Sequence, residues 1–81
     1  MTRRDVAADV RDIFREALHL DVDAEEDLLR SGMLDSLGLV RLLARLEERF
    51  GLSVSVESLE LDDLRSMASV TRYVEAALPD A

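Results

Sequence analysis

The chain of 81 residues contains no cysteine, no lysine and no tryptophan, and His19 is its only histidine. Without cysteine the protein forms no disulfide, offers no nucleophilic thiol and lacks thiolate ligands for a metal. Without lysine it has no side-chain amine for Schiff-base chemistry. One histidine without cysteine does not suffice for a zinc site, so we expect no metal centre. The carboxylates are scattered, so we expect no catalysis, although a triad of serine, His19 and aspartate would become visible only in the fold.

Long apolar runs are also missing. No segment is long enough to span a bilayer, and the first residues, Met1-Thr2-Arg3-Arg4-Asp5, lack the apolar core of a signal peptide. We therefore expect a cytoplasmic protein without membrane insertion. The net charge is −8, from 18 acidic and 10 basic residues. This charge disfavours nucleic acid and favours partners with basic patches.

Eighty-one residues are room for one domain, which we expect to span residues 1–81. Apolar residues recur at helical spacing in three segments. The first helix is expected from about Arg3 to Leu18, with Thr2 as its cap. The second should begin at Asp35-Ser36, run to Phe50 and end at Gly51. The third is expected from Ser69, its cap, to Leu78. The expected inward residues of the first and third helices are Val6, Val10, Ile13, Phe14, Ala17 and Leu18, and Val70, Tyr73, Val74 and Ala77.

The segments between these helices lack a sustained helical period. His19–Met33 reads as a long loop, pinned to the core by Leu20, Val22, Leu28 and Leu29. Leu52–Leu61 alternates like a strand, but no second strand is present to pair with it, so an extended loop is expected. Asp62–Ser66 is long enough for one short helix. The predicted fold is all-α: a small bundle of three main helices plus one short helix, with a long loop between the first two main helices. Its aromatic and methionine side chains are expected to pack in the core.

Ser36 stands out because it lies at the start of the strongest helix, directly after the long loop. The amides of a first helical turn have no intrahelical partners, and the helix dipole is positive at that end. A phosphate joined to the serine oxygen would therefore lie in a favourable field. Asp35 is a candidate to orient the hydroxyl or a partner enzyme's metal ion. Taken alone, Asp35 and Ser36 fit ordinary helix caps equally well.

The stretch Leu28–Val40, LLRSGMLDSLGLV, resembles the phosphopantetheine attachment region of acyl and peptidyl carrier proteins. Leu46–Gly51 resembles the end of their second helix, and the likeness covers nearly the whole chain. The resemblance implies that Ser36 receives a 4′-phosphopantetheine arm from coenzyme A through a phosphopantetheinyl transferase. Asp35 matches the aspartate that precedes the modified serine. The thiol of the arm would then hold the cargo as a thioester.

Two features distinguish this chain from fatty-acid carriers. Gly32 lies four residues before Ser36, and the arginines at 41, 45 and 49 interrupt the acidity of the second helix. Leu34-Asp35-Ser36 followed by Gly38 is more similar to stand-alone D-alanyl and related aminoacyl carrier proteins. That likeness implies an amino acid loaded by an adenylating ligase and passed to an acyl or aminoacyl transferase or a condensing enzyme. The alternatives are a discrete acyl carrier of a polyketide or hybrid pathway, and a cofactor-free acidic helical adaptor.

The second helix carries more apolar residues than one core-facing stripe requires. We therefore expect a docking surface for partner enzymes, although core packing is the alternative for each apolar residue. Nearby charges would tune the choice of partner. A monomer is expected, because a shuttle must visit several active sites. The acidic stretch Asp21–Asp27 is a further hypothesis, as a divalent-cation site. The docking candidates are Leu37, Val40, Leu42 and Ala44, with Arg41, Glu47 and Glu48 as the charged residues.

Overall fold

The computed structural model describes residues 5–55, 57 and 59–78, which form α-helices joined by loops and one 3₁₀ turn. None of these described residues lies in a strand, so the all-α prediction is confirmed. None of the helices among them is long and apolar enough to cross a bilayer. The elements in chain order are α1 (Val6–Leu18), α2 (Leu28–Ser31), α3 (Ser36–Phe50), η1 (Leu61–Leu64) and α4 (Met67–Ala77).

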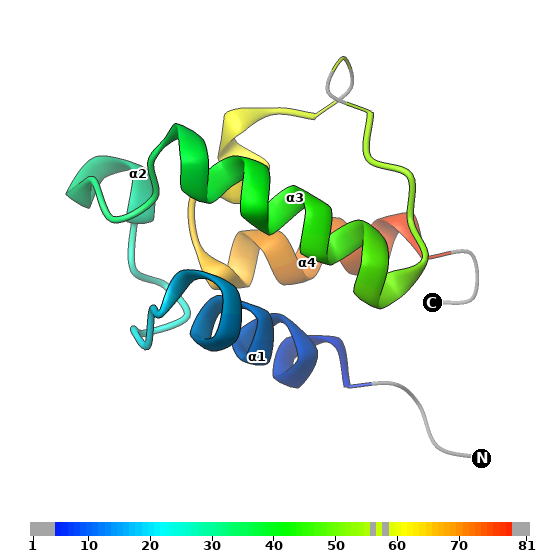
Figure 1. Cartoon of the computed structure of the whole chain (residues 1–81), viewed down its shortest axis with the longest axis horizontal. Helices are drawn as coiled ribbons and strands as arrows, with labels where there is room; N and C mark the ends of the chain where they lie inside the picture. Colours follow the sequence, from blue (N-terminus) through cyan, green and yellow to red (C-terminus); the bar gives the residue numbers. More distant parts are fainter. Residues whose placement is uncertain (1–4, 56, 58, 79–81) are drawn as a thin grey trace.

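Helix α1 lies at the centre of the packing, because it contacts both α3 and α4 (Figure 1). It runs antiparallel to both of them. The beginning of α1 and the end of α4 therefore lie at one end of the bundle. The beginning of α3 lies at the opposite end, next to α2.

One hydrophobic core joins the helices, and its members come mostly from the apolar stripes that the periodicity predicts. Phe14 and Phe50 are buried as expected, whereas Tyr73 is only partly buried. Two assignments to the interior are wrong: Ala77 is exposed at the last turn of α4, and Met33 is 46% exposed before α3. The buried apolar residues are Val6, Val10, Ile13, Phe14, Ala17, Leu28, Leu34, Leu42, Leu46, Phe50, Leu64, Met67, Val70 and Val74.

The beginnings of α1 and α4 differ from the predicted positions because other residues cap them. Asp5 has extended backbone angles and accepts a 3.1 Å hydrogen bond from the Ala8 N–H, so α1 begins at Val6 rather than near Arg3. The predicted cap, Thr2, lies outside the described residues. Ser66 accepts a 3.1 Å hydrogen bond from the Ser69 N–H, so α4 begins before the predicted cap.

The predicted long loop contains one helical turn that periodicity did not reveal. Asp27 caps α2 by accepting a 3.0 Å hydrogen bond from the Arg30 N–H, and Gly32 ends the turn with φ +79°. Leu28 is buried, which agrees with its predicted anchoring role. Leu20, Val22 and Leu29 are partly buried and pack against the core, so the loop is pinned as expected. The short helix predicted at Asp62–Ser66 is a 3₁₀ turn placed one to two residues earlier.

The segment between α1 and α3 is fastened to the beginning of α4 through Arg65 and its neighbours. The Leu28 N–H donates to the Arg65 carbonyl at 2.7 Å, and the Ala68 N–H donates to the Ala24 carbonyl at 2.9 Å. The Arg65 guanidinium also reaches carboxylate oxygens of Asp27 and Asp62, each at 2.8 Å. The Arg30 N–H and the Arg65 guanidinium lower the pKa of Asp27 from 3.8. These contacts hold α2 against the bundle, and α3 begins soon after it.

The lowered pKa of Asp27 predicts an acid-sensitive contribution to stability. A carboxyl whose pKa is lower in the folded state stabilises that state when ionised, and the effect is lost as the pH falls below 3.8. Wild-type protein should therefore exceed Asp27→Asn in free energy of unfolding near neutral pH, and the difference should shrink under acid. Urea denaturation from pH 3 to pH 7 measures it. Asp23→Asn, which changes an exposed carboxyl in the same loop, is the control. A difference independent of pH would contradict the prediction.

Candidate functional site

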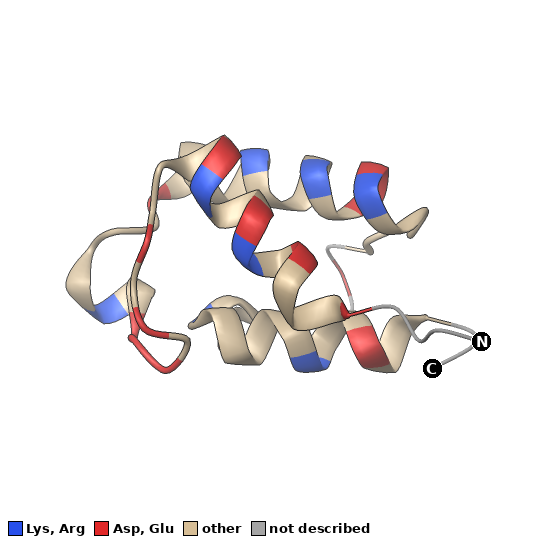
Figure 2. Ribbon diagram, turned by 90° about the horizontal axis from the view of Figure 1, so that it is seen from below, with Lys and Arg blue, Asp and Glu red and all other residues tan. Residues whose placement is uncertain are grey.

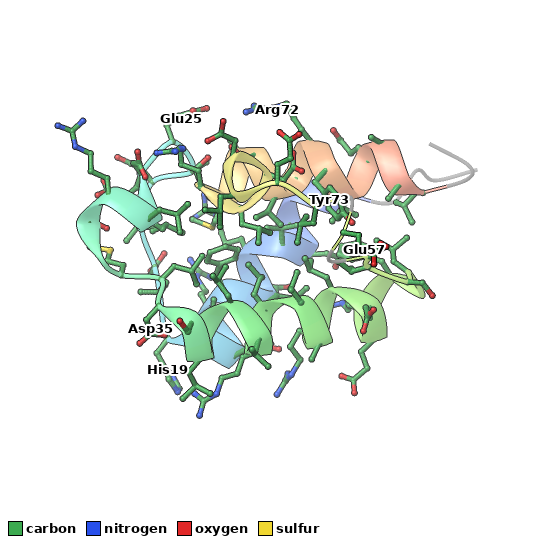
Figure 3. All side chains as sticks on the ribbon, turned by 90° about the horizontal axis from the view of Figure 1, so that it is seen from above. His19, Glu25, Asp35, Glu57, Arg72 and Tyr73 are labelled. Atoms are coloured by element: carbon green, nitrogen blue, oxygen red, sulfur yellow. The ribbon has the colours of Figure 1, made fainter. Side chains whose placement is uncertain are left out.

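The structure places Ser36 as the first residue of α3, with its side chain exposed. Asp35 precedes it in an extended conformation, and Figure 3 shows Asp35 at the free end of this helix. The Asp35 Oδ1 accepts a hydrogen bond from the Gly38 N–H at 2.8 Å. The Asp35 carbonyl accepts the Leu39 N–H at 2.8 Å and begins the helical hydrogen bonding. Asp35 and Ser36 therefore lie at the start of α3, as the sequence predicted, with Asp35 as the cap and Ser36 as the first helical residue.

The first turn of α3 is fixed by contacts on the side that faces the core, around Leu34 and Gly38. Leu34 is 4% exposed, and its N–H donates to the Leu28 carbonyl at 3.2 Å. A Cβ atom on Gly38 would lie 3.2 Å from both the Asp35 Oδ1 and the Leu34 Cδ1, and 3.7 Å from the Leu18 Cδ2. Glycine at this position lets the capping carboxylate, the leucine anchor and the end of α1 close tightly around the turn. The backbone of Ser36 is thus held firmly while its side chain faces solvent.

The Ser36 hydroxyl forms no hydrogen bond with any described residue, which distinguishes it from most of the other hydroxyls that the structure describes. Ser31 donates to the Leu28 carbonyl, Ser66 caps α4, and Thr71 donates to the Met67 carbonyl at 2.8 Å. Ser53 is likewise exposed and without a partner among the described residues, but it lies in a loop. Within the described ranges, Ser36 alone combines an uncommitted hydroxyl with the positive end of a helix, here one of 15 residues.

A phosphate diester on the Ser36 oxygen fits this position. The Ser36 and Leu37 amides belong to the first helical turn and have no intrahelical acceptor, while the Gly38 amide is occupied by Asp35. A negatively charged group placed there is stabilised by the amides and by the helix dipole. The exposed hydroxyl leaves room for a long flexible substituent. The site therefore suits covalent attachment of an anionic group rather than enclosure of a ligand.

The described residues around Ser36 form neither a catalytic triad nor a metal site. His19 ends α1 with φ +55°, and Figure 3 shows it at the same end of the bundle as Asp35. No hydrogen bond links His19 to Ser36 or Asp35 among the described residues, so the triad left open by the sequence is not formed. In the same part of the chain, no three histidine, aspartate or glutamate residues gather as a metal site. The cation site suggested for residues 21–27 therefore gains no support and stays a hypothesis, since Asp21 pairs with Arg11 and Arg15, and Asp27 pairs with Arg65.

The docking candidates divide between the solvent face of α3 and the core. Leu37 and Val40 are 59% and 64% exposed, and Ala44 is exposed beside them. Leu42 is fully buried, so its assignment to a docking surface is wrong: it lies on the stripe that faces the core. Among the described residues, the sequence interpretation missed exposed Met33 before α3 and Leu61, 64% exposed, at the start of η1. Neither lies in a segment with a helical period, so no sequence signal marked them.

Of the three charged docking candidates, Arg41, Glu47 and Glu48, one already forms a hydrogen bond within the protein. Arg41 and Glu48 are exposed. Glu47 is exposed too, but its Oε2 accepts a 2.8 Å hydrogen bond from the Val54 N–H, which fastens the loop after α3. Glu47 therefore has a structural contact that the sequence did not suggest.

The capping geometry predicts how Asp35 contributes to stability. Asp35→Ala removes the acceptor for the Gly38 N–H and should lower the free energy of unfolding by about 1 kcal/mol. Asp35→Asn keeps an acceptor and should change it by only a few tenths of that amount. Chemical denaturation of both variants measures the difference. Equal losses in the two variants would show that the charge, rather than the hydrogen bond, stabilises the turn.

Comparison with known families assigns the protein to a class. The family described as "Phosphopantetheine attachment site" matches residues 8–74, so the chain belongs to this family of carrier domains. Its cofactor is covalently attached 4′-phosphopantetheine, and the domain carries rather than catalyses. This confirms the resemblance found in the sequence and removes the cofactor-free adaptor as an explanation.

Individual relatives show which carrier proteins of this family the chain resembles. The chain is 41% identical over 72 residues to the D-alanyl carrier protein of Streptococcus sanguinis, covering 86% of this chain and 91% of the relative. It is 43% identical over the same length to the D-alanyl carrier protein of Streptococcus gordonii. Among solved structures, KstB-PCP(apo) is similar with a TM-score of 0.64 and 33% identity, covering 89% of this chain and 80% of that one.

Proposed function

We propose that Ser36 carries the 4′-phosphopantetheine arm and that the arm holds an aminoacyl group as a thioester. The observation that carries this proposal is the exposed, uncommitted Ser36 hydroxyl at the first position of α3, inside the segment that matches the attachment-site family. The chain has no cysteine, so the reactive sulfur comes with the cofactor.

The attachment reaction defines what the chain contributes. The Ser36 oxygen forms a phosphodiester with the phosphopantetheine portion of coenzyme A, and adenosine 3′,5′-bisphosphate leaves. The hydroxyl proton passes to a base on a phosphopantetheinyl transferase, because no histidine or carboxylate of the described chain bonds to this hydroxyl. Asp35 holds the helix start and so fixes the backbone beneath the attacking oxygen.

An amino acid is the proposed cargo because two curated relatives named D-alanyl carrier protein are 41% and 43% identical over most of this chain. An adenylating ligase would activate the amino acid with ATP and transfer it to the arm. An acyl or aminoacyl transferase or a condensing enzyme would then receive it. A cytoplasmic location is part of the proposal, since attachment of the arm consumes coenzyme A and loading consumes ATP.

Residues 1–81 are proposed to act as one carrier domain and as a monomer. A single hydrophobic core shared by α1, α3 and α4 supports the first part. The exposed residues Leu37, Val40 and Ala44, with Arg41, Glu47 and Glu48 nearby, are proposed to contact successive partner enzymes. Such contacts should be small and short-lived, because the cargo has to move on.

Intact mass measurement tests the carrier assignment. The apo protein is incubated with coenzyme A, magnesium and a broad-specificity phosphopantetheinyl transferase. The expected product has gained one phosphopantetheine per chain. An unchanged mass, with a known carrier domain modified in the same tube, would refute the proposal.

A loading assay tests the cargo. The modified protein is offered to a panel of adenylating ligases with ATP and each amino acid, and in parallel to enzymes that load malonyl and fatty acyl groups. The expected product is an aminoacyl thioester that hydroxylamine releases. Loading by malonyl or fatty acyl groups alone would instead support the polyketide or hybrid acyl carrier.

A further inference from the structure

The net charge of −8 is distributed unevenly over the molecule. Helix α3 carries three arginines against two glutamates, whereas residues 19–35 carry six carboxylates against one arginine. Residues 57–66 carry four carboxylates against one arginine. Figure 2 shows the basic positions recurring along α3 and the acidic positions along the loop that joins α1 to α2. The acidity that dominates the composition therefore belongs to the connecting segments rather than to the helix that begins at Ser36.

The arginines of α3 are not equally available to a partner. Arg49 pairs with Asp9 at 3.0 Å and with Asp12 at 3.5 Å, so α1 neutralises it. Arg41 and Arg45 form no ion pair with the described residues. Arg45 lines a shallow hollow between α1 and α3 together with Glu16 and Glu48, which offset part of its charge. Arg41, five residues after Ser36, is the uncommitted cation nearest to it on this helix.

Helical spacing places these cations beside the exposed apolar residues. Leu37, Arg41 and Arg45 follow one another at intervals of four and form one row on the helix surface. Val40 and Ala44 form the neighbouring row, also at an interval of four. Glu47 lies seven residues, or two turns, beyond Val40, and its carboxylate accepts the Val54 N–H. The exposed face of α3 thus presents apolar side chains bordered by guanidinium groups along its length.

We infer that the enzyme which loads the arm receives α3 in an apolar recess bordered by carboxylates, not in the basic surface that the net charge favours. This inference rests on the proposed carrier function. A basic recess would bring like charges against Arg41 and Arg45, whereas carboxylates there would pair with them. Charges farther away than about 8 Å are largely screened at physiological salt, so the residues in contact decide the fit more than the total of −8. Three carboxylates accompany α3: that of Asp35 is occupied by the helix cap, that of Glu47 accepts the Val54 N–H, and Glu48 lies seven residues beyond Arg41, in the half of the helix away from Ser36.

Reversing the charge of Arg41 tests the inference, because the direction in which the loading rate changes depends on the charge of the partner surface. Arg41→Glu should lower kcat/KM for loading of the modified protein about tenfold, and added salt should reduce the loss. Arg41→Gln should lower it less. Arg72→Glu makes the same change of charge on exposed α4 and should stay within about twofold of wild type. An increase or no change in Arg41→Glu would overturn the inference. Because all variants should still gain phosphopantetheine at Ser36, such a result would leave the carrier function intact.

A second measurement needs no loading enzyme. Two synthetic helical peptides with the same leucine stripe, one flanked by glutamates and one by lysines, are titrated into isotope-labelled protein. The glutamate peptide should shift the backbone amide signals of Leu37, Val40, Arg41 and Ala44. The lysine peptide should instead shift signals from residues 19–35. Preferential binding of the lysine peptide to α3 would refute the inference, as would indifference of α3 to the charge of the two peptides.

Discussion

Ser36→Ala is expected to gain no phosphopantetheine under conditions that modify the wild-type protein completely. Alanine lacks the oxygen that forms the phosphodiester, so the loss should be total rather than partial. The fold should persist, because Ser36 is exposed and the helix cap is formed by Asp35 instead. Intact mass spectrometry of both proteins after the same incubation measures the result. Circular dichroism of the variant should match that of the wild type.

Ser53→Ala is the matched control for this experiment. Ser53 is also exposed and has no hydrogen-bond partner among the described residues, but it lies after α3 rather than at a helix start. It should accept one phosphopantetheine at the wild-type rate. Full modification of Ser36→Ala, or loss of modification in Ser53→Ala, would mean that another hydroxyl is the attachment residue.

Leu42→Ala is expected to destabilise the protein by about 2–5 kcal/mol. Leu42 is fully buried between the helices, so its truncation removes apolar contacts and leaves a cavity. A domain of this size has a total stability of roughly 4–12 kcal/mol, so the loss is a large part of the whole. Urea denaturation measures the free energy of unfolding. The melting temperature should fall by roughly 10 °C or more.

Leu37→Ala, the same substitution on the opposite face of α3, is its control. Leu37 is 59% exposed, so its truncation should change the free energy of unfolding by no more than about 0.5 kcal/mol. Loading of the modified protein should nevertheless slow if Leu37 contacts the partner enzyme. Similar destabilisation by both variants would contradict the division of α3 into a core face and a docking face.

Helix α3 was predictable from the sequence to the residue because its signals are local. Asp35 supplies the cap, and Gly51 takes the left-handed conformation, φ +67°, that ends the helix. The position of Ser36 followed from the same signals. The beginning of α4 was mistaken because Ser66 and Ser69 are both good caps, three residues apart. Met67 is buried in the core as the first residue of α4, which is consistent with Ser66 as the cap, and burial is a property of the fold rather than of the local sequence.

Two features, helix α2 and the division of α3 into a buried and an exposed face, could not be predicted because they depend on contacts between residues distant in the sequence. One turn is too short to show a period, so α2 was hidden, and it is held by the Arg65 carbonyl and guanidinium. The apolar surface of α3 was recognised as too wide for one core stripe. Which part faces the core depends on where α1 packs, so Leu42 was assigned to the wrong face and Val40 to the correct one. The three arginines of α3 were visible in the sequence, but the pairing of Arg49 with Asp9 and Asp12 of α1 depends on the same packing and was not.

The described ends of the bundle have a practical consequence for handling the protein. The beginning of α1 and the end of α4 lie together, across the bundle from the beginning of α3 (Figure 1). A purification tag, a fluorescent protein or a tether to a solid support joined through either terminus would sit remote from Ser36. The protein anchored in this way would display the serine outward, so immobilised arrays should remain accessible to enzymes added in solution.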